Sequence, residues 1–170
     1  IDAAAANASS PFEAPLADDV PGELNDLTLP IRSLEPNTHK QVTIAIVVAG
    51  SRGHTYARFA EKYPEHLKVV GVSDILENRK LDIAGKHGIP QEHQFGDYHE
   101  FLAVPKFADA VVISTPDDLH YEPCMKALEL GYDVLLEKPC AQTEKECRDI
   151  LAQAKKYNRI VAVCHVLRYS

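Results

Sequence analysis

From residue 42 onward, short apolar runs alternate with longer segments in which apolar residues recur every three or four positions. The apolar runs cover residues 42–48, 67–73, 109–114, 132–136 and 159–164, with a weaker run at 94–95. They are nearly continuous rather than alternating in polarity, which is typical of strands covered on both faces. The pattern therefore predicts about six strands of one parallel sheet.

The segments between these runs predict helices. After the first run, the spacing i, i+3, i+4, i+7 predicts an apolar helix face made by Tyr56, Phe59, Ala60 and Tyr63. A second helix is expected within 75–88, and a third is bounded by Pro123 near its start and Gly131 after its end.

The last helix has the clearest signals. Thr143 and Glu146 form a candidate capping box at its start. The apolar stripe that follows consists of Cys147, Ile150, Leu151 and Ala154. Strands and helices that alternate in this way predict an α/β fold, a doubly wound parallel Rossmann sheet with helices on both faces.

Residues 1–40 have a different composition. They lack a sustained apolar period and are rich in Ala, Pro, Asp and Asn, with prolines at positions 11, 15, 21, 30 and 36. Such a segment cannot bury enough apolar surface to fold by itself. We therefore expect an extended or disordered acidic arm at 1–40 and a single folded domain at 41–170.

The charge distribution argues against nucleic acid as a partner. The arm has seven acidic and two basic residues, so it carries five of the seven net negative charges and leaves the rest nearly neutral. Binding to a phosphate backbone would need a basic stripe, which is missing.

The cysteines and the hydropathy bear on the cellular compartment of the protein and on metal and membrane binding. The four cysteines form no CxxC pair and show no metal-site spacing, so we expect no metal and favour a reducing compartment, the cytoplasm. No apolar run reaches the roughly 18 residues of a membrane span. No signal peptide is visible, although a leader removed before residue 1 stays open.

The segment TIAIVVAGSRGHTY, residues 43–56, predicts a buried strand, a glycine turn and a helix. A dinucleotide-binding fingerprint, GxGxxG, uses its glycines for the tight turn, the approach of the pyrophosphate and the packing of the helix. The three positions are Val48, Gly50 and Gly53, so two of three match, and the amides at the helix start can face a phosphate. An ordinary strand-to-helix turn stays open as an alternative.

Asp74 supports the dinucleotide interpretation. It follows the second apolar run and lies 21 residues after Gly53. A carboxylate at this distance can accept hydrogen bonds from an adenosine ribose and would repel a 2′-phosphate, which favours NAD over NADP. The alternative is that Asp74 caps the next helix. Arg52 weakens the preference for NAD, because a guanidinium in the turn can reach a phosphate.

The ends of two further strands carry candidate chemistry. Ligands of doubly wound sheets bind at the carboxyl ends of the strands, where Thr115, Pro116 and His120 follow one run. Glu137 and Lys138 end another. We expect Lys138 to be partly buried and to hold, or help deprotonate, a substrate hydroxyl. A surface salt bridge of Lys138 and a capping role of His120 are the alternatives.

Taken together, these segments resemble the Gfo/Idh/MocA family, named after glucose-fructose oxidoreductase, inositol dehydrogenase and a rhizopine-catabolism protein. The resemblance covers residues 42–170. It rests on AGSRGH, GVSD, STPDDLH, LLEKP and HVLRYS, which occur in the family's order and spacing.

The resemblance implies roles for individual residues. Lys138 matches the family's lysine beside the nicotinamide, which contacts the substrate, and it is the implied catalytic residue. The implied cofactor-binding residues are Gly50, Ser51, Arg52, Gly53, His54, Asp74, Ser114, Thr115, Pro116, His120, Glu137, Pro139 and Arg168.

The chain departs from the family pattern in two respects. Val48 stands where such members usually carry glycine, and valine does not easily adopt a positive φ, so we expect weaker cofactor binding and an intact fold. The family also has a C-terminal α+β domain that supplies most substrate contacts. We expect that domain to be absent here, because the chain stops at Ser170.

The resemblance implies the cofactor-binding half of an NAD-dependent oxidoreductase. The enzyme would move hydride between nicotinamide and a hydroxyl carbon of a sugar or polyol, and would be a homo-oligomer in its full-length form. Two alternatives remain: an NAD-dependent glycosidase of the same family, or a noncatalytic nucleotide-binding or interaction module.

Overall fold

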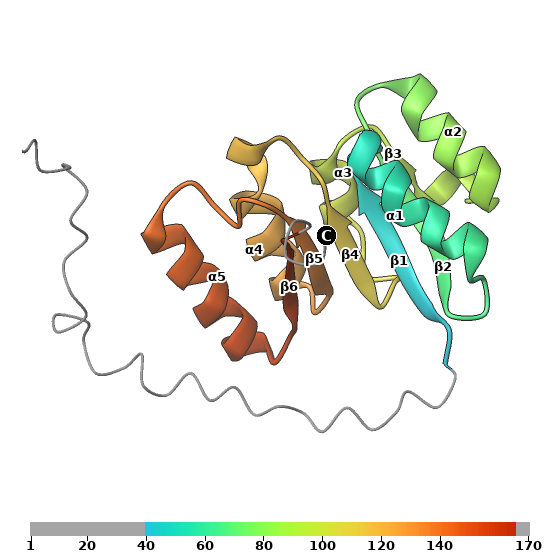
Figure 1. Ribbon diagram of the computed structural model, residues 1–170. Coiled ribbons are helices and arrows are strands. Elements are labelled where there is room, and N and C mark those ends of the chain that lie inside the picture. Colours follow the sequence, from blue (N-terminus) through green and yellow to red (C-terminus); the bar gives the residue numbers. More distant parts are fainter. Residues whose placement is uncertain (1–39, 166–170) are drawn as a thin grey trace, which may run out of the picture. The chain divides into compact units, whose positions relative to one another are not determined.

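A computed structural model describes residues 40–165 of the chain, which contain one six-stranded sheet (Figure 1). All its strands are parallel, and their order in space is β3-β2-β1-β4-β5-β6. The strands are β1 (Val42–Val47), β2 (Leu67–Ser73), β3 (Gln94–Phe95), β4 (Ala110–Ile113), β5 (Asp133–Glu137) and β6 (Val161–Cys164). Each predicted strand is confirmed to within two residues at either end, and the sheet has the strand order of a Rossmann fold.

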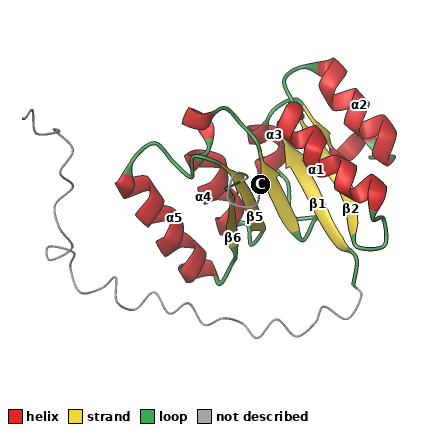
Figure 2. Ribbon diagram, viewed as in Figure 1, coloured by secondary structure: helices red, strands yellow, loops and turns green. Residues whose placement is uncertain are grey.

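Helices connect the strands (Figure 2). They are α1 (Ser51–Lys62), α2 (Glu77–His87), α3 (Tyr98–Ala103), α4 (Tyr121–Glu129) and α5 (Glu144–Tyr157), with short 3-10 turns η3 (Gln91–His93) and η4 (Asp117–Leu119). The helices expected from periodicity are confirmed, whereas α3 was not predicted. Within residues 40–165, no helix is long and apolar enough to cross a membrane. The predicted arm, apart from Lys40, and Arg168 lie outside the described residues.

The sheet separates two apolar cores. Ala45 and Val47 of β1 face a core that includes residues of α3, α4 and α5. Ile44 and Ile46 of the same strand face a second core with α1 and α2. Successive side chains of a strand point to opposite faces, so continuous apolar runs are what a sheet covered on both faces requires. The predicted fold class is therefore confirmed.

The predicted apolar face of α1 is wrong in part. The residues that α1 buries are Gly53, Ala57 and Ala60, whereas the side chain of Phe59 is 48% exposed. The helix lies so close to β1 that a Cβ atom on Gly53 would stand 2.5 Å from the carbonyl oxygen of Val48. Only small side chains fit at this distance, so Phe59 is displaced to the flank, where its ring contacts Tyr63.

The capping box at the start of α5 is confirmed. The side chain of Thr143 accepts a hydrogen bond from the backbone N–H of Glu146, and the carboxylate of Glu146 accepts one from the backbone N–H of Thr143. Ile150 and Ala154 of the predicted stripe are buried, so α5 packs on the sheet with the expected face.

His87, the last residue of α2, makes stability depend on pH. Burial lowers the pKa of its imidazole below the ordinary 6.5, despite Glu61 of α1 at 3.6 Å. The unfolded chain then takes up a proton that the folded chain does not, so stability is complete above pH 6.5 and falls as the pH drops toward the folded-state pKa.

We expect the free energy of unfolding to decrease between pH 7.5 and 5.5 by at most about 1.4 kcal/mol for each pH unit from this group. Urea unfolding of the wild type and of His87→Gln at each of these two pH values measures this decrease in the free energy of unfolding. The variant should show a smaller decrease, and an equal decrease in both proteins would assign the effect to other groups.

Candidate cofactor site at the carboxyl edge of the sheet

The turn after β1 adopts a conformation that normally needs glycine. Val48, at the first position of the fingerprint, has φ of 70°, in the left-handed region. For a β-branched residue this conformation costs about 1–2 kcal/mol. Two neighbouring strands hold it in place: the N–H of Val48 donates to the carbonyl of Ser73 at 2.9 Å, and its own carbonyl accepts from the hydroxyl of Ser114 at 2.7 Å.

The two glycines of the turn differ in their surroundings. A Cβ atom on Gly53 would meet the backbone oxygen of Val48 at 2.5 Å and the side chain of Ile46 at 3.1 Å. A Cβ atom on Gly50 would come no closer than 4.0 Å to any protein atom. Gly53 is therefore needed for packing of the helix, while the surface over Gly50 is open to a ligand.

Asp74 lies at the end of β2 and is 3% exposed. One carboxylate oxygen accepts from the backbone N–H of Ala49 at 2.8 Å, and the other accepts from that of Leu76 at 2.7 Å. The first bond ties β2 to the glycine turn. The second bond comes from the N–H of Leu76, which is the N-cap residue of α2. The N-cap position has no side-chain hydrogen bond, so Asp74 does not cap the helix in the usual sense.

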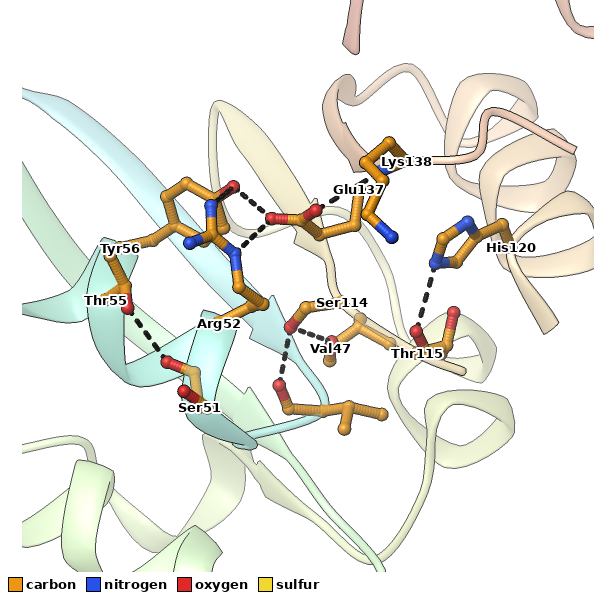
Figure 3. Close-up of polar contacts among 11 residues, drawn as sticks. Val47, Ser51, Arg52, Thr55, Tyr56, Ser114, Thr115, His120, Glu137 and Lys138 are labelled. Atoms are coloured by element: carbon orange, nitrogen blue, oxygen red, sulfur yellow. Dashed lines mark hydrogen bonds and ion pairs between the residues drawn. The ribbon is translucent and has the colours of Figure 1, made fainter. Parts of the chain in front are cut away.

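Glu137, the last residue of β5, binds two side chains of α1 across the edge of the sheet (Figure 3). Its carboxylate accepts from the guanidinium of Arg52 at 2.6 Å and from the hydroxyl of Tyr56. Burial by itself raises the pKa of the Glu137 carboxyl, but the bonds from Tyr56 and Arg52 outweigh it, so the pKa is lowered. Glu137 is therefore a fixed anion, and its bonds raise the pKa of Arg52.

Tyr56 belongs to this cluster although the sequence did not indicate it. Its side chain was assigned to an apolar helix face, but its hydroxyl contacts both Arg52 and Glu137. Burial, together with hydrogen bonds to Cys164 and Glu137, raises the pKa of the phenol. Glu137 is 81 residues away in the chain, so no local pattern could have revealed this contact.

Lys138 follows Glu137 in the turn after β5. Its side chain is exposed, so the expected partial burial is wrong, because the residue lies beyond the last paired residue of the strand. Its Nζ has no ion-pair or hydrogen-bond partner within residues 40–165, and the salt-bridge alternative is therefore not supported. Its backbone N–H donates to the carboxylate of Glu137 at 3.2 Å.

These groups surround a pocket of about 240 Å³ at the carboxyl edge of the sheet. The pocket is lined by Arg52, Ser114, Thr115, Asp117, Glu137 and Lys138. It combines two cations, two anions and two hydroxyls that come from α1, the segment between β4 and α4, the end of β5 and the turn after β5. Five of the six residues were predicted site residues, and Asp117 is the addition. A polar pocket in this place is where an open parallel sheet binds its ligands.

His120 lies behind the pocket rather than in it. Its ring is 1% exposed. Nε2 contacts the carbonyl oxygen of Thr115 at 3.0 Å (Figure 3). Nδ1 contacts that of Pro139 at 2.6 Å. Although His120 precedes α4, its side chain forms no cap. The ring therefore does not face a bound molecule directly.

The remaining predicted residues form the border of the site. Ser51, Pro116 and Pro139 are exposed at the same edge. His54 links α1 to α2, because its Nδ1 contacts the carbonyl of Gly50 and its Nε2 contacts the carboxylate of Asp82, each at 2.9 Å. Within the described part of the chain, no group of three metal-ligating side chains occurs.

Comparisons with known proteins agree with this fold. A family model described as an oxidoreductase family with an NAD-binding Rossmann fold, Gfo/Idh/MocA, matches residues 37–165. A curated relative, inositol 2-dehydrogenase/D-chiro-inositol 3-dehydrogenase of Lactiplantibacillus plantarum, is 29% identical over 68% of this chain and 33% of its own length. The chain thus spans about a third of the length of such relatives.

Two solved structures share the fold. An NAD-binding protein from Listeria innocua is 33% identical, with a TM-score of 0.64 over 76% of this chain and 37% of its own. The WlbA dehydrogenase from Bordetella pertussis, solved in complex with NADH and UDP-GlcNAcA, is 18% identical, with a TM-score of 0.69 over 77% of this chain and 39% of its own. The six-stranded sheet, the glycine turn and the family match lead to one conclusion: the chain belongs to the Gfo/Idh/MocA oxidoreductases and contains their NAD-binding Rossmann domain.

Proposed function

We propose that this chain is the cofactor-binding part of an NAD-dependent enzyme that transfers hydride between nicotinamide and a hydroxyl carbon of a sugar or polyol. The names of relatives support the substrate class: they include inositol dehydrogenases and a dehydrogenase solved with NADH and a nucleotide sugar. The single observation that carries the proposal is the position of the glycine turn, Asp74 and Lys138 at one edge of the sheet.

The turn fits a dinucleotide. The open surface over Gly50 gives a pyrophosphate access to the backbone, and the N–H groups at the start of α1 are available to its oxygens. Asp74 is held at the adjacent strand end by the N–H groups of Ala49 and Leu76 and is 3% exposed, so the hydroxyls of an adenosine ribose would reach its remaining lone pairs only with a local shift of the turn. This placement favours NAD over NADP, since a 2′-phosphate would meet the carboxylate.

The pocket beside the turn would hold the nicotinamide half and the reacting carbon. Nicotinamide supplies or accepts the hydride when bound. Lys138 would donate a hydrogen bond to the substrate oxygen, and its Nζ, which has no partner among residues 40–165, is available for this role. Arg52 and Tyr56 would act indirectly, because they fix the carboxylate of Glu137, which in turn binds the backbone of Lys138.

We also propose that the full-length protein works as a homo-oligomer in the cytoplasm. All four cysteines are free, which is compatible with a reducing compartment. Ile160, just before β6, is 53% exposed, and β6 pairs on one side only within residues 40–165. Such an apolar, unpaired edge favours association. Size-exclusion chromatography of the full-length protein with light scattering tests the oligomer, which a monodisperse monomer would exclude.

A noncatalytic nucleotide-binding module is a second candidate, and Val48 favours it. Its side chain lies 4.0 Å from the position of a Cβ atom on Gly50, so it borders the surface that a pyrophosphate must approach. If Val48 obstructs that surface, the chain would keep its fold and lose its cofactor.

A titration with NADH separates these candidates. We expect the wild type to bind with a submillimolar Kd, and Val48→Gly to bind up to about tenfold more tightly, because the side chain beside the turn is removed. Nicotinamide fluorescence measures the Kd of the wild type and of the variant without indole background, since the chain has no Trp. Val42→Gly, at the other end of β1, is the matched control and should change stability but not affinity. Binding only after the Val48 change would favour the noncatalytic module.

A further inference from the structure

The buried ring of His120 joins two loops of the site. The β-ladder between β4 and β5 ends at the pair Ile113 and Leu136; beyond it, Glu137 still pairs with Cys164 of β6 and the N–H of Ser114 donates to the carbonyl of Val47, but no ladder joins the β4 side to the β5 side. The loops that continue from there carry Thr115 on one side and Lys138 on the other, and both residues line the pocket. A direct contact between these loops therefore adds a link between the two sides that the β4–β5 ladder does not provide.

His120 makes this contact through its two ring nitrogens. Nδ1 lies 2.6 Å from the carbonyl oxygen of Pro139, in the loop after β5, and Nε2 lies 3.0 Å from that of Thr115, in the loop after β4. Carbonyl oxygens only accept hydrogen bonds and a neutral imidazole carries a single N–H, so the ring donates to one of the two oxygens and contacts the other. The shorter distance identifies the bond to Pro139 as the stronger link between the loops.

The loop after β4 is also stabilised from within. The hydroxyl of Thr115 donates to the carbonyl of Leu119 at 3.0 Å, and the N–H of Leu119 donates to the carbonyl of Pro116 at 2.9 Å. His120 follows directly and begins α4, whose residue Cys124 donates to the carbonyl of His120. The ring of His120 therefore extends from a hydrogen-bonded segment of the chain toward the turn that contains Lys138 and Pro139.

From this geometry we infer that His120 is a positioning residue that sets the width of the nicotinamide half of the pocket, by holding the turn of Lys138 and Pro139 against Thr115. The inference rests on the proposed cofactor function. Because the ring is 1% exposed, it acts through the two loops and not by contact with the cofactor. The glycine turn and Asp74 have their own hydrogen bonds, so the adenosine half of the site is independent of His120.

Two ligands separate the two halves of the site. NADH occupies both halves, whereas ADP-ribose lacks the nicotinamide and depends on the glycine turn. We expect His120→Phe, which keeps a planar ring without a donor, to weaken NADH binding by about tenfold and to change ADP-ribose binding less than twofold. His120→Gln retains an N–H donor and should lie between Phe and the wild type. Fluorescence and calorimetric titrations measure the two affinities.

His93→Phe is the matched control. The ring of His93 also contacts a backbone carbonyl, that of Val70 at 3.1 Å, and stacks on Phe107, away from the residues that line the pocket. We expect it to change thermal stability but neither affinity. If His120→Phe does not fold, the His120→Gln variant provides the same test, with a loss of about threefold for NADH alone.

The outcomes distinguish this inference from the proposed function. Equal losses for NADH and ADP-ribose, or no loss for either, in a folded His120 variant would overturn the positioning role while leaving cofactor binding intact. A wild-type chain that binds neither ligand would refute both the cofactor function and the role of His120. A selective loss of NADH binding, with partial recovery in His120→Gln, supports the inference.

Discussion

Replacing Lys138 by alanine in the full-length protein is expected to lower turnover by about 10²–10⁴-fold, while the Kd for NADH changes less than about threefold. The reason is the position of its amino group, which lies at the pocket without a partner within residues 40–165. Such a group can interact with the substrate oxygen during the reaction. In the proposed function, binding of the dinucleotide depends mainly on the glycine turn, and no hydrogen bond or ion pair joins Lys138 to that turn within residues 40–165.

Steady-state rates with a polyol substrate and a separate NADH titration measure these two effects. Lys138→Arg is the informative companion, because it keeps the charge but cannot exchange a proton near neutral pH, and it should remain far below the wild type. Lys145→Ala is the matched control, since Lys145 is an exposed lysine that pairs with Asp149 on α5. Equal losses of turnover and of NADH affinity would remove Lys138 from the catalytic role.

The second large effect is expected from Gly53→Ala, which should destabilise the fold by about 2–3 kcal/mol. The added Cβ atom would stand 2.5 Å from the carbonyl oxygen of Val48. That oxygen cannot easily move, because the same residue is bound to Ser73 of β2 and to Ser114 after β4. Helix α1 must therefore shift away from the sheet. We expect the melting temperature to fall by roughly 5–12 °C.

Gly50→Ala provides the contrasting variant three residues away. Its Cβ atom would have no neighbour closer than 4.0 Å, and φ at this position is −75°, which alanine adopts freely. We expect the melting temperature to stay within about 2 °C and NADH to bind at least about tenfold more weakly, since the methyl group occupies the approach of the pyrophosphate. Thermal unfolding and NADH titration of both variants are the measurements. If Gly50→Ala binds NADH normally, the pyrophosphate does not pass over this turn.

Val48 shows how the fold tolerates a residue that the turn disfavours. A valine resists a positive φ, and Val48 nevertheless has φ of 70°. Hydrogen bonds from both neighbouring strands hold its peptide groups, so the sheet imposes the conformation on the residue. The same bonds account for the intact fold around Val48, whereas the expected weakening of cofactor binding stays a prediction.

Features that depend on residues close in sequence were determined by the sequence. The apolar runs gave all six strands, because a strand covered on both faces needs apolar side chains at nearly every position. The capping box of Thr143 and Glu146 spans three residues, and its hydrogen bonds form within the first turn of α5. The glycine turn and Asp74 could be found because their spacing follows from one strand–helix–strand unit.

Features that depend on distant residues were decided by the tertiary structure. Whether α1 buries Phe59 or Ala57 depends on how close the helix approaches β1, which hydrophobic periodicity does not contain. The partners of Glu137 lie 81 and 85 residues away, and the ring of His120 reaches a carbonyl 19 residues along the chain. The sequence could name the residues that meet at the carboxyl edge of the sheet, since parallel strands bring their ends together. Which of them face a ligand and which support the others depends on side-chain packing between loops, and only the folded chain determines that.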